Sequence, residues 1–255
     1  MSSVSVETLH GVARLQLARP ERKNAITTEM YAELAQALEG AQDDASVRVI
    51  LLHGQADVFT AGNDVEDFLR RPPEDSDAPV FRFMAALSGA AKPVVVAVNG
   101  VAVGIGTTLL LHCDLVYCAD DSRFSLPFVN LGLCAEFGSS LLLPLAAGYH
   151  LAAEKLLLGE PISAEQALDM GLVNRILPPA EVLDYARRQC ERLCQLPPES
   201  LRETKRLLKS GWKAAVQKAI ADENAVLHRL IGSAEAREAF QAFVERRKPD
   251  FSKIS

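Results

Sequence analysis

Apolar positions recur along the first two thirds of this chain in two alternating patterns, one typical of strands and one typical of helices. Residues 4–18 alternate apolar and polar positions around a turn at Gly11, which predicts a β-hairpin. From Thr28, taken as the capping residue, to about Asp43, apolar residues return at helical spacing. The alternation continues, with strands predicted at 47–53, 92–98 and 114–118. Helices are predicted at 66–71 and at 106–112, and another is predicted to follow residue 79 and to end at about Gly89. Recurrence of strand then helix indicates an α/β core.

The pattern changes after about Leu177, where the strand signals stop. Helical patterns follow at 179–195, 198–209 and 213–246, and a break is expected in the last of them at Gly232. Such helices have to bury their apolar faces on the core or on a neighbouring subunit. These faces contain Leu201, Leu207, Leu208, Ala225, Leu227, Leu230, Phe240 and Phe243.

We therefore divide the chain into a core of residues 1–196 and a helical C-terminal region of residues 197–255. One segment, Pro72–Pro79, combines proline with charge and has no apolar periodicity, so it is predicted to be a loop. A lid over a bound ligand is a hypothesis for this loop.

Composition and charge narrow the class of protein. The chain has 255 residues, of which 49% are hydrophobic and 24% charged, as in an ordinary globular protein. The net charge of −6 argues against a nucleic-acid partner, and the basic cluster of Lys205, Arg206 and Lys209 is interpreted as solvated surface. The chain begins without a signal-peptide pattern and reaches no run of ~18 apolar residues, so we expect a soluble cytoplasmic protein without membrane contact.

Metal chemistry is not predicted. The five cysteines form no CxxC pair, and Cys190 and Cys194, four residues apart on a predicted helix, are interpreted as packing residues. The histidines have no metal-ligand spacing. Asp114, at the start of a predicted strand, is expected to fix a strand or a subunit contact rather than to perform chemistry.

One glutamate stands in an unusually apolar stretch. Between Asp121 and His150 the charged residues are Asp121, Arg123 and Glu136. A carboxylate among Leu, Phe and Gly is costly to desolvate unless it is paired or its pKa rises, and a raised pKa suits proton transfer near neutral pH. The alternative is structural: Glu136 would bond exposed N–H groups where a helix starts, before the run 137–145.

Two glycine turns follow predicted strands. The first contains Gly62 and Asn63, and the second contains Gly104 and Ile105 and opens a helix. Glycine lets the backbone bend tightly and turn an N–H group into open space. Two such groups that meet at one point would stabilise a developing oxyanion. Each turn by itself is equally consistent with plain architecture.

Taken in order, several motifs resemble the crotonase (enoyl-CoA hydratase/isomerase) family over nearly the whole chain. They are Arg19–Ala25, Phe59–Asp64, Lys92–Pro93, Asn99–Gly106, His112–Tyr117, Phe124–Gly132 and Gly159–Val173. The resemblance implies an α/β fold, a ClpP-like spiral of ββα units followed by a helical C-terminal region used in trimer formation. It also implies an acyl-CoA thioester as the substrate, no separate cofactor, and a homotrimer or a dimer of trimers.

The same resemblance assigns site residues. The backbone N–H groups of Asn63 and Ile105 would bind the thioester oxygen as its enolate forms. The adenosine and phosphate parts of CoA would lie near Arg22, Lys23, Ala25, Ala61, Asp64 and Val65. For Arg22 and Lys23, solvated surface charge is an equally good interpretation.

The chain departs from the hydratase pattern at two positions. Family hydratases carry two glutamates that handle water, and Thr108 and Phe128 occupy those positions here. Neither side chain is an acid or base at neutral pH, so hydration is disfavoured. These two residues and Leu133 are instead expected to contact the substrate.

Glu136 precedes a Ser-Ser pair, as in the peroxisomal-type Δ3,Δ2-enoyl-CoA isomerases of the family. That branch usually has proline before the glutamate, and this chain has Ala135. The resemblance implies an isomerase that moves a 3-enoyl-CoA double bond to the trans-2 position with Glu136 as the proton shuttle. The alternatives are another crotonase-type acyl-CoA enzyme, such as a dienoyl-CoA isomerase, a ring-handling enzyme, a hydratase or a lyase, and a non-catalytic acyl-CoA-binding protein.

Overall fold

The computed structural model describes residues 3–55, 57–73 and 77–254, and these contain two sheets. The larger sheet has the order β1-β2-β3-β4-β6-β9 and the smaller has the order β5-β7-β8. The chain passes back and forth between them from β4 to β9, which gives the expected spiral. The strands are β1 Val4–Leu9, β2 Val12–Leu17, β3 Val49–His53, β4 Val94–Val98, β5 Val101–Val103, β6 Leu115–Ala119, β7 Arg123–Ser125, β8 Ile162–Ser163 and β9 Arg175–Leu177.

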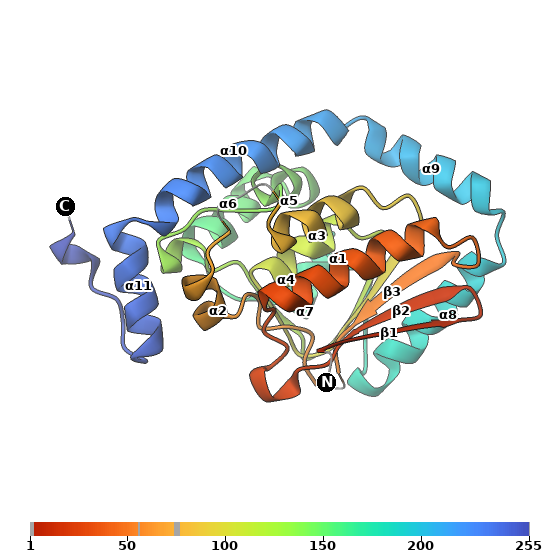
Figure 1. Ribbon diagram of the computed structural model, residues 1–255, viewed down its shortest axis with the longest axis horizontal. Helices are drawn as coiled ribbons and strands as arrows, with labels where there is room; N and C mark the ends of the chain where they lie inside the picture. The colour runs from red at the N-terminus through yellow and green to blue at the C-terminus, as the bar shows by residue number, and fades with distance from the viewer. Residues whose placement is uncertain (1–2, 56, 74–76, 255) are drawn as a thin grey trace.

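Helices cover both faces of the larger sheet, so its central strands are apolar on both sides (Figure 1). Val94, Val96 and Val98 of β4 face the main core with α1 and α3, while Val95 and Ala97 face α8. The helices are α1 Thr28–Asp43, α2 Val65–Arg70, α3 Pro79–Ser88, α4 Ile105–Thr108, α5 Ser139–Ala147, α6 Tyr149–Leu158, α7 Ala164–Asp169 and α8 Val182–Cys194. Short 3₁₀ turns lie at Pro20–Arg22, Leu109–His112, Val129–Leu131, Pro179–Glu181 and Phe251–Lys253.

The predicted strands and helices are confirmed apart from their ends. The predicted loop and lid at Pro72–Pro79 lie partly outside the described residues, and Pro79 is already the first residue of α3. The hairpin turns at His10 and Gly11, both with positive φ. The predicted cap of α1 was wrong by one residue, because the side chain of Thr27 accepts from the Met30 N–H. Thr28 is the first helical residue, and its N–H and hydroxyl both donate to Asp67.

The C-terminal helices are α9 Pro198–Ser210, α10 Lys213–Ile231 and α11 Ala234–Val244, with the expected break at Gly232. In Figure 1, α9 and α10 arch over the core and α10 passes above α5. Leu207 and Leu208 are not buried on the core, since they are 62% and 73% exposed, which leaves a neighbouring subunit as the expected partner of this face. The trimer that would cover them stays a prediction. Within the described residues, no helix is both long enough and apolar enough to span a membrane.

The basic cluster on α9 is not all solvated surface. The Lys205 side chain is 8% exposed, and its Nζ donates to Asp114 Oδ2 at 2.6 Å and to the Lys92 carbonyl at 2.8 Å. The same Asp114 oxygen accepts from the Val94 N–H at 2.7 Å. The structural role expected for Asp114 is confirmed, and this ion pair links α9 to the beginnings of strands β4 and β6.

Replacing Lys205 with Met should lower the free energy of unfolding by about 3 kcal/mol, because Asp114 would keep a charge without its partner. The matched control is Lys218→Met on α10, which breaks an exposed pair with Asp222 and should cost less than about 0.5 kcal/mol. Urea unfolding of the two variants and the parent chain measures both effects. Equal losses in the two variants would contradict the assignment.

Candidate active site

The two glycine turns meet at one place in the fold. Gly62 has φ of +85°, and a Cβ atom there would lie 2.5 Å from the carbonyl oxygen of Val103. Gly104, which follows Val103 in the chain, has φ of +54° and is the residue immediately before helix α4. Only glycine tolerates so close an approach with this backbone conformation. The residues that follow the glycines, Asn63 and Ile105, therefore line one cavity of about 550 Å³.

The N–H groups of these two residues have no protein acceptor in the described part of the chain. The bridge between Asn63 and Ile26 uses the carbonyl of Gly62 and the N–H of Asp64, which leaves the Asn63 N–H outside it. The Asn63 side chain is held elsewhere, because its Oδ1 accepts from the Tyr31 hydroxyl at 2.5 Å. Two unused backbone donors at a cavity wall suit an oxyanion.

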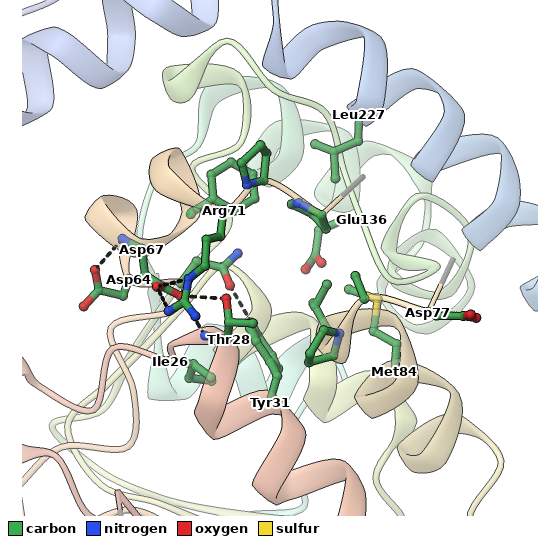
Figure 2. A pocket seen from close by; sticks show the side chains of 17 residues that line it. Ile26, Thr28, Tyr31, Asp64, Asp67, Arg71, Asp77, Met84, Glu136 and Leu227 are labelled. Atoms are coloured by element: carbon green, nitrogen blue, oxygen red, sulfur yellow. Dashed lines mark hydrogen bonds and ion pairs between the residues drawn. The ribbon is translucent and has the colours of Figure 1, made fainter. Parts of the chain in front are cut away.

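Glu136 lies beside these donors and is 5% exposed. Glu136 lines two cavities, and Figure 2 shows its carboxyl group pointing into the second of them, between Leu227 and the side chains of Tyr31 and Met84. Thr108 of α4 donates its hydroxyl hydrogen to Glu136 Oε1 at 2.5 Å. Burial raises the pKa of Glu136 to about 8, the bond from Thr108 opposes the rise, and the nearby charge of Glu223 adds to it.

The backbone next to Glu136 is strained and held in place. Phe137 has φ of +56°, which is rare for an aromatic residue, and its side chain is fully buried. His112 stacks on the Phe137 ring with 3.9 Å between centroids, and its Nε2 donates to the Phe137 carbonyl at 2.7 Å. Burial lowers the pKa of His112 to about 4, so the ring is neutral and packs here without a charge.

The structural interpretation of Glu136 as a helix-start carboxylate is wrong. Helix α5 begins at Ser139, and its first free N–H groups are bound by another residue. Glu223 of α10 accepts from the Gly138 N–H at 2.5 Å and from the Ser140 N–H at 2.9 Å. Among the described residues, the Glu136 carboxyl group thus accepts no hydrogen bond from a backbone N–H group, and it is available to the cavity.

The cavity brings together all but one of the residues predicted to bind substrate. Thr108 is absent from the wall because it lies behind Glu136. Asp64 caps α2 and pairs with Arg19 at 2.7 Å, which makes it a structural carboxylate as well as a lining one. The roles of these residues stay predictions. Those on the wall are Arg22, Lys23, Ala25, Ala61, Asp64, Val65, Phe128 and Leu133.

The sequence did not reveal which tail residues close the site. Leu227 of α10 and Phe240 of α11 line the same cavity, and Leu227 also lines a second one of about 390 Å³ on the other side of Glu136. Tyr31 and Met84 contribute to this second cavity (Figure 2). The apolar faces of the tail were visible in the sequence, but their target was not. No group of metal ligands occurs among the described residues.

Comparison with known proteins identifies the family of this chain. A profile of the family described as Enoyl-CoA hydratase/isomerase matches residues 7–253. The chain belongs to the enoyl-CoA hydratase/isomerase family, the crotonases. The crotonase fold is shown further by the structure of Pseudomonas aeruginosa OdaA, which has a TM-score of 0.94 and 47% sequence identity over 96% of this chain and 100% of that chain.

Crotonase relatives with different activities are similarly close to this chain. The Escherichia coli 2,3-dehydroadipyl-CoA hydratase is 32% identical, over 98% of this chain and 99% of that protein. The Escherichia coli 1,2-epoxyphenylacetyl-CoA isomerase is 36% identical, over 95% of each. Human enoyl-CoA delta isomerase 2 is 32% identical, over 93% of this chain and 62% of that longer protein. Membership implies an acyl-CoA enzyme, and overall similarity does not select the reaction.

The buried carboxyl group should make stability depend on pH. The pKa of Glu136 is about 8 in the fold against an ordinary value of 4.5, so between these pH values the folded chain keeps a proton that the unfolded chain releases. The contribution of Glu136 to stability therefore falls as pH rises from about 4.5 to about 8. Glu136→Gln should remove this loss, which is at most on the order of 5 kcal/mol.

Urea unfolding at intervals from pH 5 to pH 9 measures this effect. The variant should gain stability relative to the parent chain across the window and level off above it. Parallel curves for the two proteins would show that the Glu136 carboxyl group titrates normally.

Proposed function

We propose that this crotonase is a Δ3,Δ2-enoyl-CoA isomerase with Glu136 as its single acid–base group. The observation that carries the proposal is one buried carboxyl group beside the two unused N–H donors of Asn63 and Ile105. An isomerisation needs one base that takes a proton and returns it, because no water is added. A base with a pKa near 8 can do both close to neutral pH.

The reaction follows from this arrangement. The thioester oxygen of a 3-enoyl-CoA accepts hydrogen bonds from the N–H groups of Asn63 and Ile105. The Glu136 carboxylate removes a proton from C2, and the electrons move onto the thioester oxygen as a dienolate. Each donor lowers the barrier by about 3 kcal/mol, because its bond strengthens as that charge develops. Glu136 then delivers the proton to C4, and the double bond ends between C2 and C3.

The hydroxyl of Thr108 supports the single-base reaction. It donates to Glu136 Oε1, so Oε2 is the oxygen left to exchange the proton with the substrate. One of the two positions that hold a glutamate in hydratases therefore holds a hydroxyl here, which orients Glu136. Phe128, at the other such position, lines the cavity as an apolar wall.

The other carboxylates of the two cavities are poorly suited to activate water. Asp64 pairs with Arg19, and Asp67 pairs with Arg71 and accepts from Thr28. Glu66 is exposed and lies near Arg22. Asp77 points away from the cavity in Figure 2. Ion pairing keeps a carboxylate charged and weakly basic, so it disfavours the proton transfers that hydration needs.

A second candidate is a ring-handling isomerase, which the relative named 1,2-epoxyphenylacetyl-CoA isomerase favours with 36% identity. The same carboxyl group and the same oxyanion site would serve an aromatic acyl group. Turnover of an aryl epoxide thioester, with little turnover of a linear 3-enoyl-CoA, would select this candidate.

The test is a spectrophotometric assay of trans-3-hexenoyl-CoA together with hydration of crotonyl-CoA. We expect isomerisation without hydration, and kcat/KM should rise with pH through about 8 as the Glu136 carboxylate forms. Glu136→Gln should lower kcat at least about 10³-fold with a small change in KM, since the base acts in the transition state.

The control is Glu191→Gln, an exposed carboxylate on α8, which should leave both constants unchanged. Near-parental turnover by Glu136→Gln would end the assignment. Hydration of crotonyl-CoA by the parent chain would mean that another acid replaces the two missing glutamates.

A further inference from the structure

One side of helix α10 forms a stripe that faces α5. Val216 and Ile220 lie against Gly138, where an added Cβ atom would contact both side chains. Glu223 follows on the same side, and Leu227, one turn later, lines the cavities around Glu136. A glutamate is thus placed within an otherwise apolar stripe. It is 6% exposed, so its burial has to be offset by bonds.

Those bonds are directed at the segment that carries Glu136. Glu223 Oε2 accepts from the Gly138 N–H, and Oε1 accepts from both the N–H and the hydroxyl of Ser140. In turn, the N–H and hydroxyl of Ser139 donate to the Glu136 carbonyl. The carboxylate on α10 therefore fixes the first turn of α5, and this turn fixes the backbone of Glu136.

Glu223 and His112 support the backbone after Glu136 from two different elements. His112 holds the Phe137 carbonyl from the core, and Glu223 holds the residues immediately after it from the tail. Phe137 and Gly138 both have positive φ, a conformation that the segment would leave readily without such support. With both anchors, the Glu136 side chain is directed at the cavity.

We propose that Glu223 is a positioning residue, which holds the Glu136 carboxyl group at the substrate by binding the first turn of α5 from the C-terminal region. This inference rests on the proposed role of Glu136 as the base. Other crotonase chemistry that uses Glu136 would depend on the same anchor.

The charge of Glu223 also acts on Glu136. The groups that face Glu136 are Thr108 from α4, Tyr31 from α1, Cys134 from the preceding loop and Glu223 from α10. Of these, Thr108 cannot titrate, and burial keeps Tyr31 and Cys134 protonated by raising the pKa of each. Glu223 is thus the negative charge that makes ionisation of Glu136 harder, and its removal lowers the pKa of Glu136.

The test is Glu223→Gln, assayed with trans-3-hexenoyl-CoA across pH 5 to 9. The amide has a hydrogen donor where a carboxylate oxygen met an N–H group, so the turn loosens, and kcat should fall about 10- to 100-fold while KM changes less than about threefold. The rising limb of kcat/KM should move to lower pH. The matched control, Asp222→Asn, removes a charge from the next residue, which is exposed and paired with Lys218. It should change neither quantity.

The variant Ser140→Ala distinguishes the effect of Glu223 on the position of Glu136 from the effect of its charge on the pKa of Glu136. It removes one hydrogen-bond donor to Glu223 and keeps the Glu223 carboxylate. We therefore expect kcat to fall, while the rising limb of kcat/KM stays at the same pH. It also tests positioning if Glu223→Gln does not fold. If kcat stays within about twofold of the parent in both variants, or if Glu223→Gln lowers only thermal stability, the proposal is wrong.

A readout without turnover separates this proposal from the isomerase assignment. The carboxyl ¹³C signal of Glu136, assigned by its loss in Glu136→Gln, reports its ionisation directly. In Glu223→Gln its titration should move to lower pH even if no 3-enoyl-CoA is converted. An unmoved titration overturns the role of Glu223, whatever the reaction proves to be.

Discussion

The burial of one carboxyl group is the constraint around which the site is built. Glu136 is removed from water, and among the described residues no cation pairs with it, so it is stable mainly in its neutral form. Three separate parts of the chain meet to hold it. Thr108 bonds its oxygen, His112 supports the following residue, and Glu223 secures the helix beyond. Each contact comes from a different element, so the carboxyl group is placed by the tertiary fold and not by its local sequence.

Strand β5 of the smaller sheet supplies the rigid side of this arrangement. Gly104 directly follows β5, and the loop that carries Gly62 is held against the same strand, because Thr60 forms a bridge to Ala102. Gly62 touches the backbone beside Gly104, so the two oxyanion donors are spaced by packing between turns. In the proposed reaction, a single proton then moves between fixed groups.

Much of the fold and part of the site could be predicted from local patterns. The hairpin at 4–18, the buried strand at 94–98 and the break at Gly232 have signals within a few residues. Lys205 and Glu223 were missed because their partners, Asp114 and Ser140, lie some ninety and eighty residues away in the chain. Nothing local separates a buried charge in an amphipathic helix from a solvated one. In hindsight, the glutamate in the stripe Val216, Ile220, Leu227 was the available signal for α10.

The placement of α10 has a consequence for how the enzyme comes into being on the ribosome. Strands β1 to β7, the glycine turns and Glu136 itself are all encoded before residue 140, and these parts can begin to pack early in synthesis. The carboxylate that secures the turn after Glu136, and the leucine that covers the cavity, arrive some eighty residues later. A nascent chain therefore carries Glu136 long before that residue is held in place, and the site proposed around it is completed only at the end of translation.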